Sequence, residues 1–198
     1  MKRLGILLSG RGSNFEAIAS HIDRGDLEAE IAAVVSNVEE APGLQRARER
    51  GLSAFFLSSK GLDRESFDLQ VMRLLEKQSA DFVCLAGFMR LLSPRFIQSF
   101  RHRILNIHPS LLPAFPGMHA QRQALEYGVK ISGCTVHFVD EGLDSGPIIL
   151  QAAVPVLDGD TEELLSARIL EQEHDLYSRA LQLVIGGHIR VSGRRVES

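Results

Sequence analysis

Short apolar runs that alternate with longer helical patterns constrain the fold of this 198-residue chain more than any other feature. We expect strands at Arg3–Leu8, Ile31–Ser36, Ala54–Leu57, Phe82–Ala86 and Ile104–His108. We expect helices at Asn14–Arg24, Pro42–Arg50, Asp63–Gln78 and Pro94–Phe100, which begin at the cap or first-turn residues Asn14, Pro42, Asp63 and Ser93-Pro94. Nearly continuous apolar strands separated by helices predict a parallel sheet with helices on both faces.

The pattern changes after His108. A loop with three prolines, Pro109–Met118, precedes a helix at His119–Tyr127. Strands at Lys130–Asp140 and Pro147–Val156 have no helix between them, which favours an antiparallel pair. A last helix over Asp160–Gly186 carries one apolar stripe of core residues, Leu165, Ile169, Leu176, Ala180 and Val184.

These elements predict a single Rossmann-like α/β domain over residues 1–198. Its twisted sheet has about seven strands and is mostly parallel, with helices on both faces and an antiparallel C-terminal strand pair. The charged tail around Gly193-Arg194-Arg195 is expected to fray.

Composition narrows the class of protein. The formal net charge of −3 and a pI near 6.2 give no basic signal for a nucleic-acid partner. No apolar stretch is long enough for a membrane span, and the run Leu4–Leu8 is too short for a secretory signal. Cys84 and Cys134 lie in apolar runs, as core thiols of a reducing compartment would. We therefore expect a cytoplasmic protein.

The first turn, Ser9–Asn14, contains Gly10 and Gly12 between a strand and a helix. Glycines let a backbone approach a ligand, and a helix start offers unpaired N–H groups, so a phosphate is the natural guest. A tight strand-to-helix turn explains the same residues equally well. The dinucleotide fingerprint is not met, because Phe15 replaces its third glycine.

Asn106, His108 and Asp144 are the candidate catalytic residues. Asn106 and His108 are two apart on one strand, so their side chains leave the same face at its carboxyl end. Asp144 lies in the glycine-rich segment Glu141–Gly146. An amide, an imidazole and a carboxylate suit acyl transfer to an amine, which needs oxyanion donors and proton transfer near neutral pH.

Several segments together resemble one known family. The segments SGRGSNFEAI, LAGFMRLLSP, LNIHPSLLPAFPGMHA, TVHFVDEGLDSGPII and LEQEH occur in this order over about residues 4–188. They are similar to the folate-dependent glycinamide ribonucleotide formyltransferases. The resemblance implies transfer of a formyl group from 10-formyltetrahydrofolate to the glycyl amine of phosphoribosylglycinamide, in de novo purine biosynthesis.

The same resemblance implies site residues. Substrate phosphate and ribose would be bound by Gly12, Ser13, Asn14 and Glu173. Folate would be bound by Arg64, Met89, Arg90, Leu91, Leu92, Asn106, Asp140, Glu141, Gly142, Leu143 and Asp144. Residues 1–100 would form the phosphate- and ribonucleotide-binding half, and residues 101–190 the catalytic and folate-binding half. Leu112-Pro113 resembles the family's cis-peptide turn.

One position departs from the family pattern, since Gln121 stands where a second histidine is common. His119, His137 and His174 are interpreted as structural, and no spacing of His and Cys predicts a metal site. The partners expected are small molecules, with no nucleic acid and no membrane, and the chain is expected to be a monomer or homodimer.

Three alternatives remain at this point. A methionyl-tRNA formyltransferase would share the central residues but carry a further C-terminal domain and a basic surface. A formyltetrahydrofolate hydrolase resembles a longer chain with an N-terminal regulatory domain. A non-catalytic folate- or nucleotide-binding module would use the same fold without chemistry.

Overall fold

The computed structural model describes residues 1–197 and divides into two compact units, Met1–Leu105 and Asn106–Ser198. The first unit contains β1 (Lys2–Leu8), α1 (Ser13–Asp23), β2 (Ala29–Ser36), α2 (Pro42–Glu49), β3 (Ala54–Phe56), α3 (Arg64–Lys77), β4 (Phe82–Leu85) and α4 (Pro94–Ser99). Strand β5 (Ile104–His108) ends in the second unit, which contains α5 (Ala120–Tyr127), β6 (Ile131–Phe138), β7 (Ile148–Pro155), α6 (Glu162–Ile185), β8 (Arg190–Ser192) and β9 (Arg195–Glu197).

One seven-stranded sheet has the order β3-β2-β1-β4-β5-β6-β7, and β8 and β9 form a separate hairpin sheet. The predicted α/β class with a mostly parallel seven-stranded sheet and an antiparallel pair is thereby confirmed. The expected single domain over residues 1–198 stays a prediction.

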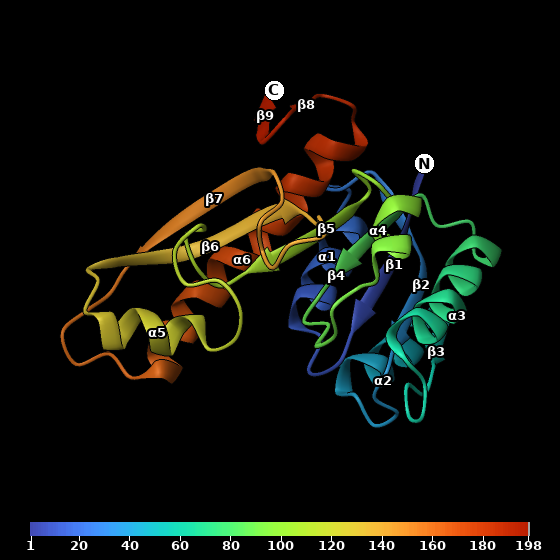
Figure 1. Ribbon diagram of the computed structural model, residues 1–198, viewed down its shortest axis with the longest axis horizontal. Helices are drawn as coiled ribbons and strands as arrows, with labels where there is room; N and C mark the ends of the chain where they lie inside the picture. The colour runs from blue at the N-terminus through green and yellow to red at the C-terminus, as the bar shows by residue number, and fades with distance from the viewer. Residues whose placement is uncertain (198) are drawn as a thin grey trace. The chain divides into compact units, whose positions relative to one another are not determined.

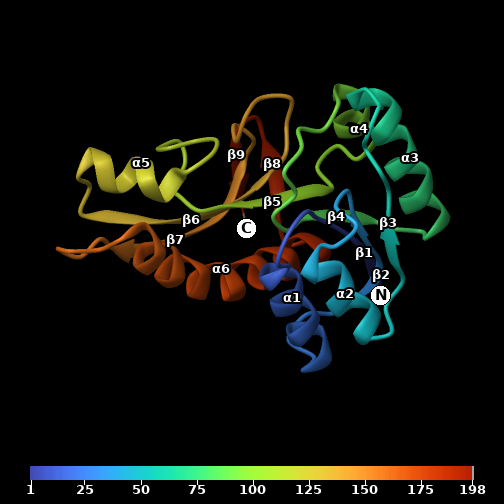
Figure 2. The ribbon, with the colours of Figure 1, turned by 90° about the horizontal axis from the view of Figure 1, so that it is seen from below.

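In the first unit, β1 pairs in parallel with β2 on one side and with β4 on the other. The chain therefore builds outward from β1 to β3 and then crosses back to β4. In sheets of this kind ligands bind beyond the carboxyl ends of the strands where the order reverses. Here that place is the end of β1 and β4. Figure 2 shows α1 and α2 on one side of these strands and α3 and α4 on the other.

Most of the predicted helix starts are confirmed. Asp63 and Ser93 are N-caps whose side chains accept backbone N–H groups of Ser66 and Phe96, and Pro42 is the first residue of α2. Asn14 lies in the first turn of α1, as predicted, but the helix begins one residue earlier, at Ser13, and its N-cap is Gly12.

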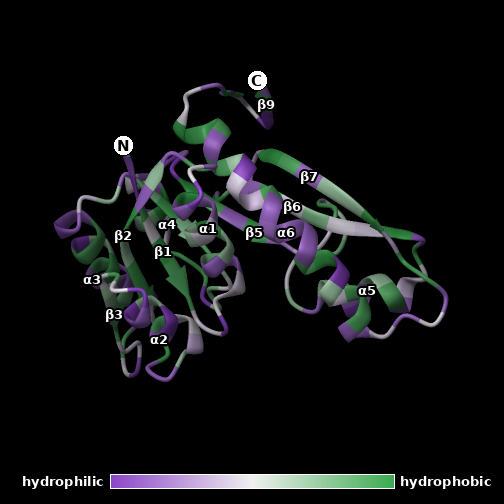
Figure 3. Cartoon of the chain, turned by 180° about the vertical axis from the view of Figure 1, so that it is seen from behind, coloured by the Kyte–Doolittle hydropathy of each residue, from purple (hydrophilic) through white to green (hydrophobic). Residues whose placement is uncertain are grey.

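The second unit places α6 along β6 and β7, as Figure 1 shows. All five predicted stripe residues of α6 are buried. Hydrophilic and hydrophobic residues alternate along this helix in Figure 3, as expected for a helix with one buried face. The tail prediction was wrong, because β8 and β9 pair in antiparallel register.

The proline-rich loop of residues 109–118 is held by buried hydrogen bonds. The Thr135 hydroxyl donates to the Ser110 carbonyl (2.7 Å) and accepts the Leu112 N–H (3.0 Å). Gln151 Nε2 donates to the Leu112 carbonyl (2.9 Å), and the Leu112-Pro113 bond is cis, as the family resemblance implied. The loop is therefore fixed at its start by β6 and β7.

Two other predictions concern buried thiols and membrane spans. Cys84 and Cys134 are both buried, and burial raises the pKa of each thiol to about 12, so both are protonated near neutral pH. Among the helices of residues 1–197, none has the length and apolarity that crossing a bilayer requires.

Candidate active site

The turn after β1 presents backbone groups at the start of α1. Gly12 has a φ of 76°, in the left-handed region that favours glycine. Its backbone packs against α2, and a Cβ on Gly12 would come within 2.7 Å of Gly43 Cα. No side chain caps α1 at this residue. A helix start without a side-chain cap leaves N–H groups and a positive dipole end for an anion. Ser13 is partly exposed and Asn14 is buried.

A second segment of the first unit, Met89–Leu92, follows β4. Its start is fastened to the end of β1, because the Ser9 hydroxyl accepts the Met89 N–H (2.9 Å) and the Ser9 N–H donates to the Gly87 carbonyl (3.0 Å). Ser9 also donates to Asn37 Oδ1 after β2 (2.6 Å). The segment that is predicted to bind folate thus begins beside Ser9, the first residue of the predicted phosphate turn, where the strand order reverses.

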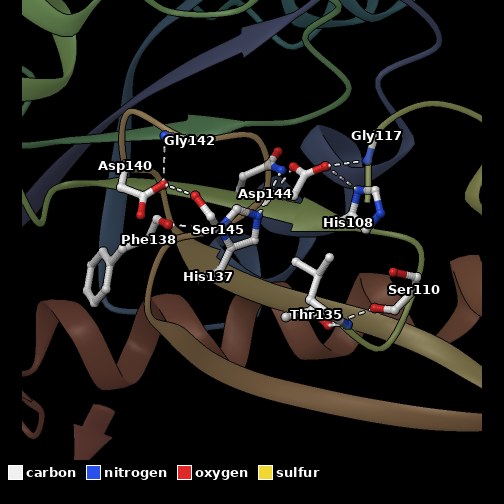
Figure 4. A network of polar contacts seen from close by, with 12 residues as sticks. His108, Ser110, Gly117, Thr135, His137, Phe138, Asp140, Gly142, Asp144 and Ser145 are labelled. Carbon is white, nitrogen blue, oxygen red and sulfur yellow. Dashed lines mark hydrogen bonds and ion pairs between the residues drawn. The ribbon is translucent and has the colours of Figure 1, made fainter. Parts of the chain in front are cut away.

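The predicted catalytic trio comes together in the second unit, as Figure 4 shows for His108 and Asp144. His108 Nδ1 lies 3.4 Å from Asp144 Oδ2, and both side chains are nearly buried. The same carboxylate oxygen accepts the Gly117 N–H (2.8 Å). Asn106 reaches the group through His137, whose Nε2 lies 3.2 Å from Asn106 Nδ2 and 3.8 Å from Asp144 Oδ1.

The two nitrogens of His108 have different partners. Nε2 lies 2.8 Å from the Phe115 carbonyl, which can only accept, so this nitrogen carries a hydrogen. Nδ1 faces the Asp144 carboxylate, and a protonated ring would satisfy both acceptors at once. The nitrogen left for proton transfer is therefore Nδ1.

His137 is the residue whose place the sequence did not reveal. Its Nδ1 lies 2.8 Å from the Phe138 carbonyl, so Nδ1 carries the hydrogen and Nε2 of the neutral ring accepts from the Asn106 amide. Burial lowers the pKa of His137, which favours this neutral form, although the Phe138 bond and Asp144 oppose the shift. One signal was available: His137 lies near the end of a strand, three residues before the Asp140–Asp144 segment.

The segment carrying Asp144 is folded around Asp140. Asp140 Oδ1 accepts the Ser145 hydroxyl (2.6 Å) and the Gly142 N–H (3.2 Å), while Leu143 at the tip remains exposed. Asp144 adopts a φ of 48°, and Phe115, whose carbonyl meets His108, adopts a φ of 52°. Positive φ at such residues costs of order 1 kcal/mol or more and is concentrated at functional sites.

The remaining predicted residues lie in both units. Arg64 begins α3 and Arg90 follows β4 in the first unit, whereas Glu173 is buried on α6 in the second. Across residues 1–197 there is no group of three or more His, Cys, Asp or Glu side chains arranged to hold a metal ion.

Comparison with known proteins defines the class to which this fold and site correspond. The model of the formyl transferase family matches residues 2–181, and the chain belongs to that family. Within it, the chain is similar to phosphoribosylglycinamide formyltransferases. It is 43% identical over 187 residues to the one from Escherichia coli (strain K12), covering 94% of this chain and 88% of that protein.

Solved structures give the same likeness. Glycinamide ribonucleotide transformylase 1 from Symbiobacterium toebii superposes with a TM-score of 0.97 at 50% identity, covering 100% of this chain and 93% of that one. The trifunctional purine biosynthetic protein adenosine-3 of Drosophila pseudoobscura pseudoobscura is 49% identical over 192 residues. The match covers 96% of this chain but only 14% of that much longer protein.

Proposed function

We propose that this chain transfers the formyl group of 10-formyltetrahydrofolate to the glycyl amine of phosphoribosylglycinamide, a step of purine biosynthesis. The observation that carries the proposal is the partly buried cluster of Asn106, His108 and Asp144, whose donors and acceptors suit acyl transfer. Similarity to phosphoribosylglycinamide formyltransferases supports the choice of substrate.

In the proposed reaction the neutral amine attacks the formyl carbon, and the carbonyl electron pair moves to oxygen. The Asn106 amide has two N–H bonds, one of which points to His137 Nε2. The other N–H of Asn106 would donate to the oxyanion, and the positive charge of the protonated His108 would also stabilise it. Because both groups are held by protein partners before substrate arrives, they stabilise charge as it develops in the transition state.

Two protons then move. The attacking nitrogen loses one, which a water bound by Asp144 would relay to solvent. The departing folate nitrogen gains one from His108 Nδ1, which regains a proton from solvent after the reaction. The C–N bond to folate breaks as the carbonyl forms again, and formyl-glycinamide ribonucleotide and tetrahydrofolate are the products. Asp144 faces Nδ1 at 3.4 Å and would keep that nitrogen charged until transfer.

The residues that we propose to bind the substrates lie in both units. The Gly12–Asn14 turn would bind the ribonucleotide phosphate through backbone N–H groups, and Glu173 would bind ribose hydroxyls. Exposed apolar side chains at Met89 and Leu91 would contact the folate ring together with the Asp140–Asp144 loop.

The test is a turnover assay. The purified chain is incubated with formyl-folate and phosphoribosylglycinamide, and the absorbance of released tetrahydrofolate is followed. We expect release that depends on both substrates. Binding of both substrates without any release would contradict the proposal and favour a non-catalytic binding module.

Hydrolysis of formyl-folate is the second candidate, because one solved structure points to it. A formyltetrahydrofolate deformylase from Pseudomonas syringae superposes with a TM-score of 0.92 at 29% identity, covering 98% of this chain and 65% of that one. The two functions separate in the same assay. Release of tetrahydrofolate at the same rate without the ribonucleotide would establish hydrolysis, whereas transfer requires the amine.

A further inference from the structure

A buried carboxylate contacts Ser93, the residue that follows the Met89–Leu92 segment. Asp68 on α3 is only 1% exposed, yet no ion pair within 4 Å joins it to a cation among the residues described. Its Oδ2 accepts the Ser93 N–H at 2.5 Å, and the Ser93 hydroxyl also bonds to the carboxylate. A buried charge is costly unless it is hydrogen-bonded, so this position calls for an explanation beyond packing.

Two arginines that are expected to bind folate, Arg90 and Arg64, act on this carboxylate. Burial raises the pKa of Asp68 and outweighs the hydrogen bonds from Ser93 and the charges of these arginines, which lower it. The Arg90 guanidinium lies over the Phe67 ring, 4.7 Å from its centroid. Among the described residues, the buried atoms Asp68 Oδ1 and Arg90 Nε have no hydrogen-bond partner. Asp68 thus has unused acceptor capacity close to two arginines.

The Met89–Leu92 segment is fastened at both ends. Ser9 holds the Met89 N–H at the start, and Asp68 holds the Ser93 N–H at the end. Ser93 is also the N-cap of α4, so one carboxylate fixes both the segment and the helix that follows. Between these anchors Met89 is 74% exposed and Leu91 58% exposed, which leaves their apolar side chains available to a flat ligand.

We infer that Asp68 is a positioning residue for folate binding, because it holds the end of the Met89–Leu92 segment through Ser93. The inference rests on the proposed function. Asp68 itself does not touch the reacting groups, so its loss should weaken formyl-folate binding without slowing the chemical step at saturation. This split distinguishes a positioning role from a catalytic one.

The experiment compares Asp68→Ala and Asp68→Asn. Asp68→Ala removes both the acceptor and the charge, and we expect KM for formyl-folate to rise about tenfold or more, with kcat and KM for the ribonucleotide changed less than about threefold. Asp68→Asn keeps an oxygen for the Ser93 N–H but loses the charge, so a smaller rise is expected. If the alanine variant does not fold, KM for formyl-folate is measured in the isosteric asparagine variant alone. A rise in that KM supports the inference.

Asp81→Ala is the matched control. Asp81 Oδ2 also accepts a backbone N–H, that of Arg3 (2.9 Å), at the opposite end of β4. The Asp81→Ala substitution should lower the melting temperature without changing KM for formyl-folate. An unchanged folate KM in folded Asp68 variants, or an equal rise in Asp81→Ala, would overturn the inference. If the unmutated protein shows no turnover at all, the proposed function itself is wrong.

Discussion

The two units present their candidate binding and catalytic groups by different means. The first offers backbone groups: an uncapped helix start after Gly12 and a segment fixed at both ends by single hydrogen bonds to Ser9 and Asp68. The second offers side chains, because His108 and Asp144 point at one another from separate segments and each has a further partner.

The difference sets what each unit can tolerate. A backbone site depends on how closely two main chains approach, so added bulk damages it. A side-chain site depends on which atoms carry protons, so a change that preserves shape but alters charge damages it most. Added bulk should therefore be the sharper test of the phosphate turn in the first unit, and altered charge the sharper test of the catalytic residues in the second.

Asp144→Asn is the strongest test of the charge dependence in the second unit. The amide keeps the shape and can still accept the Gly117 N–H, but it no longer favours a charged His108. We expect kcat to fall about 10²–10⁴-fold with an unchanged melting temperature. Asp158→Asn, at an exposed carboxylate paired with Lys130, is the control. Turnover near that of the unmutated protein would remove Asp144 from the mechanism.

Gly43→Ala tests the dependence on bulk in the first unit. A Cβ at residue 43 would lie 2.9 Å from Gly12 Cα and 3.1 Å from the Gly10 carbonyl, so the phosphate turn must shift. We expect KM for the ribonucleotide to rise about 10–100-fold, since an ångström of displacement can cost about 10²-fold. KM for formyl-folate and kcat should change much less.

The matched control is Gly5→Ala, which overpacks the same unit elsewhere. Its Cβ would meet a Leu75 methyl group at 2.3 Å in the core, so it should lower stability while leaving the ribonucleotide KM unchanged. If both variants raised that KM alike, the loss would come from general overpacking, and the close approach of Gly43 to the turn would have no special role.

The same contrast explains how much could be predicted from the sequence. Strand and helix order followed from apolar runs and caps such as Asp63 and Ser93, because these signals are local. The start of α1 was predicted one residue late, because a left-handed glycine at residue 12 replaces the usual polar cap. The hairpin of β8 and β9 was missed because its strands, of three residues each, are too short to show a period.

Contacts between distant segments were harder to predict. Asn106 and His108 could be paired because two residues on one strand share a face. The Phe115 carbonyl and the Gly117 N–H left no trace in the sequence, since any residue type supplies the same backbone groups. His137 was interpreted as structural because a single strand histidine carries no partner in its own pattern, whereas the structure gives it the Asn106 amide.

The smallest expected effect concerns the charge state of His137. Burial lowers its pKa in the folded state, while an unfolded chain has a histidine pKa near 6.5, so below about pH 6.5 the unfolded state binds more protons. The free energy of unfolding therefore decreases as the pH is lowered below about 6.5, by at most about 1.4 kcal/mol per pH unit from this one group. In His137→Gln the amide oxygen can accept from Asn106 but cannot be protonated, so the free energy of unfolding should change less between about pH 7.5 and about pH 5.5.

Urea unfolding of the unmutated protein and of His137→Gln measures this change, with His102→Gln at an exposed position as the control. An equal change in both variants would assign the effect to imidazole loss in general, and the buried neutral ring would no longer explain how the Asn106 amide is held.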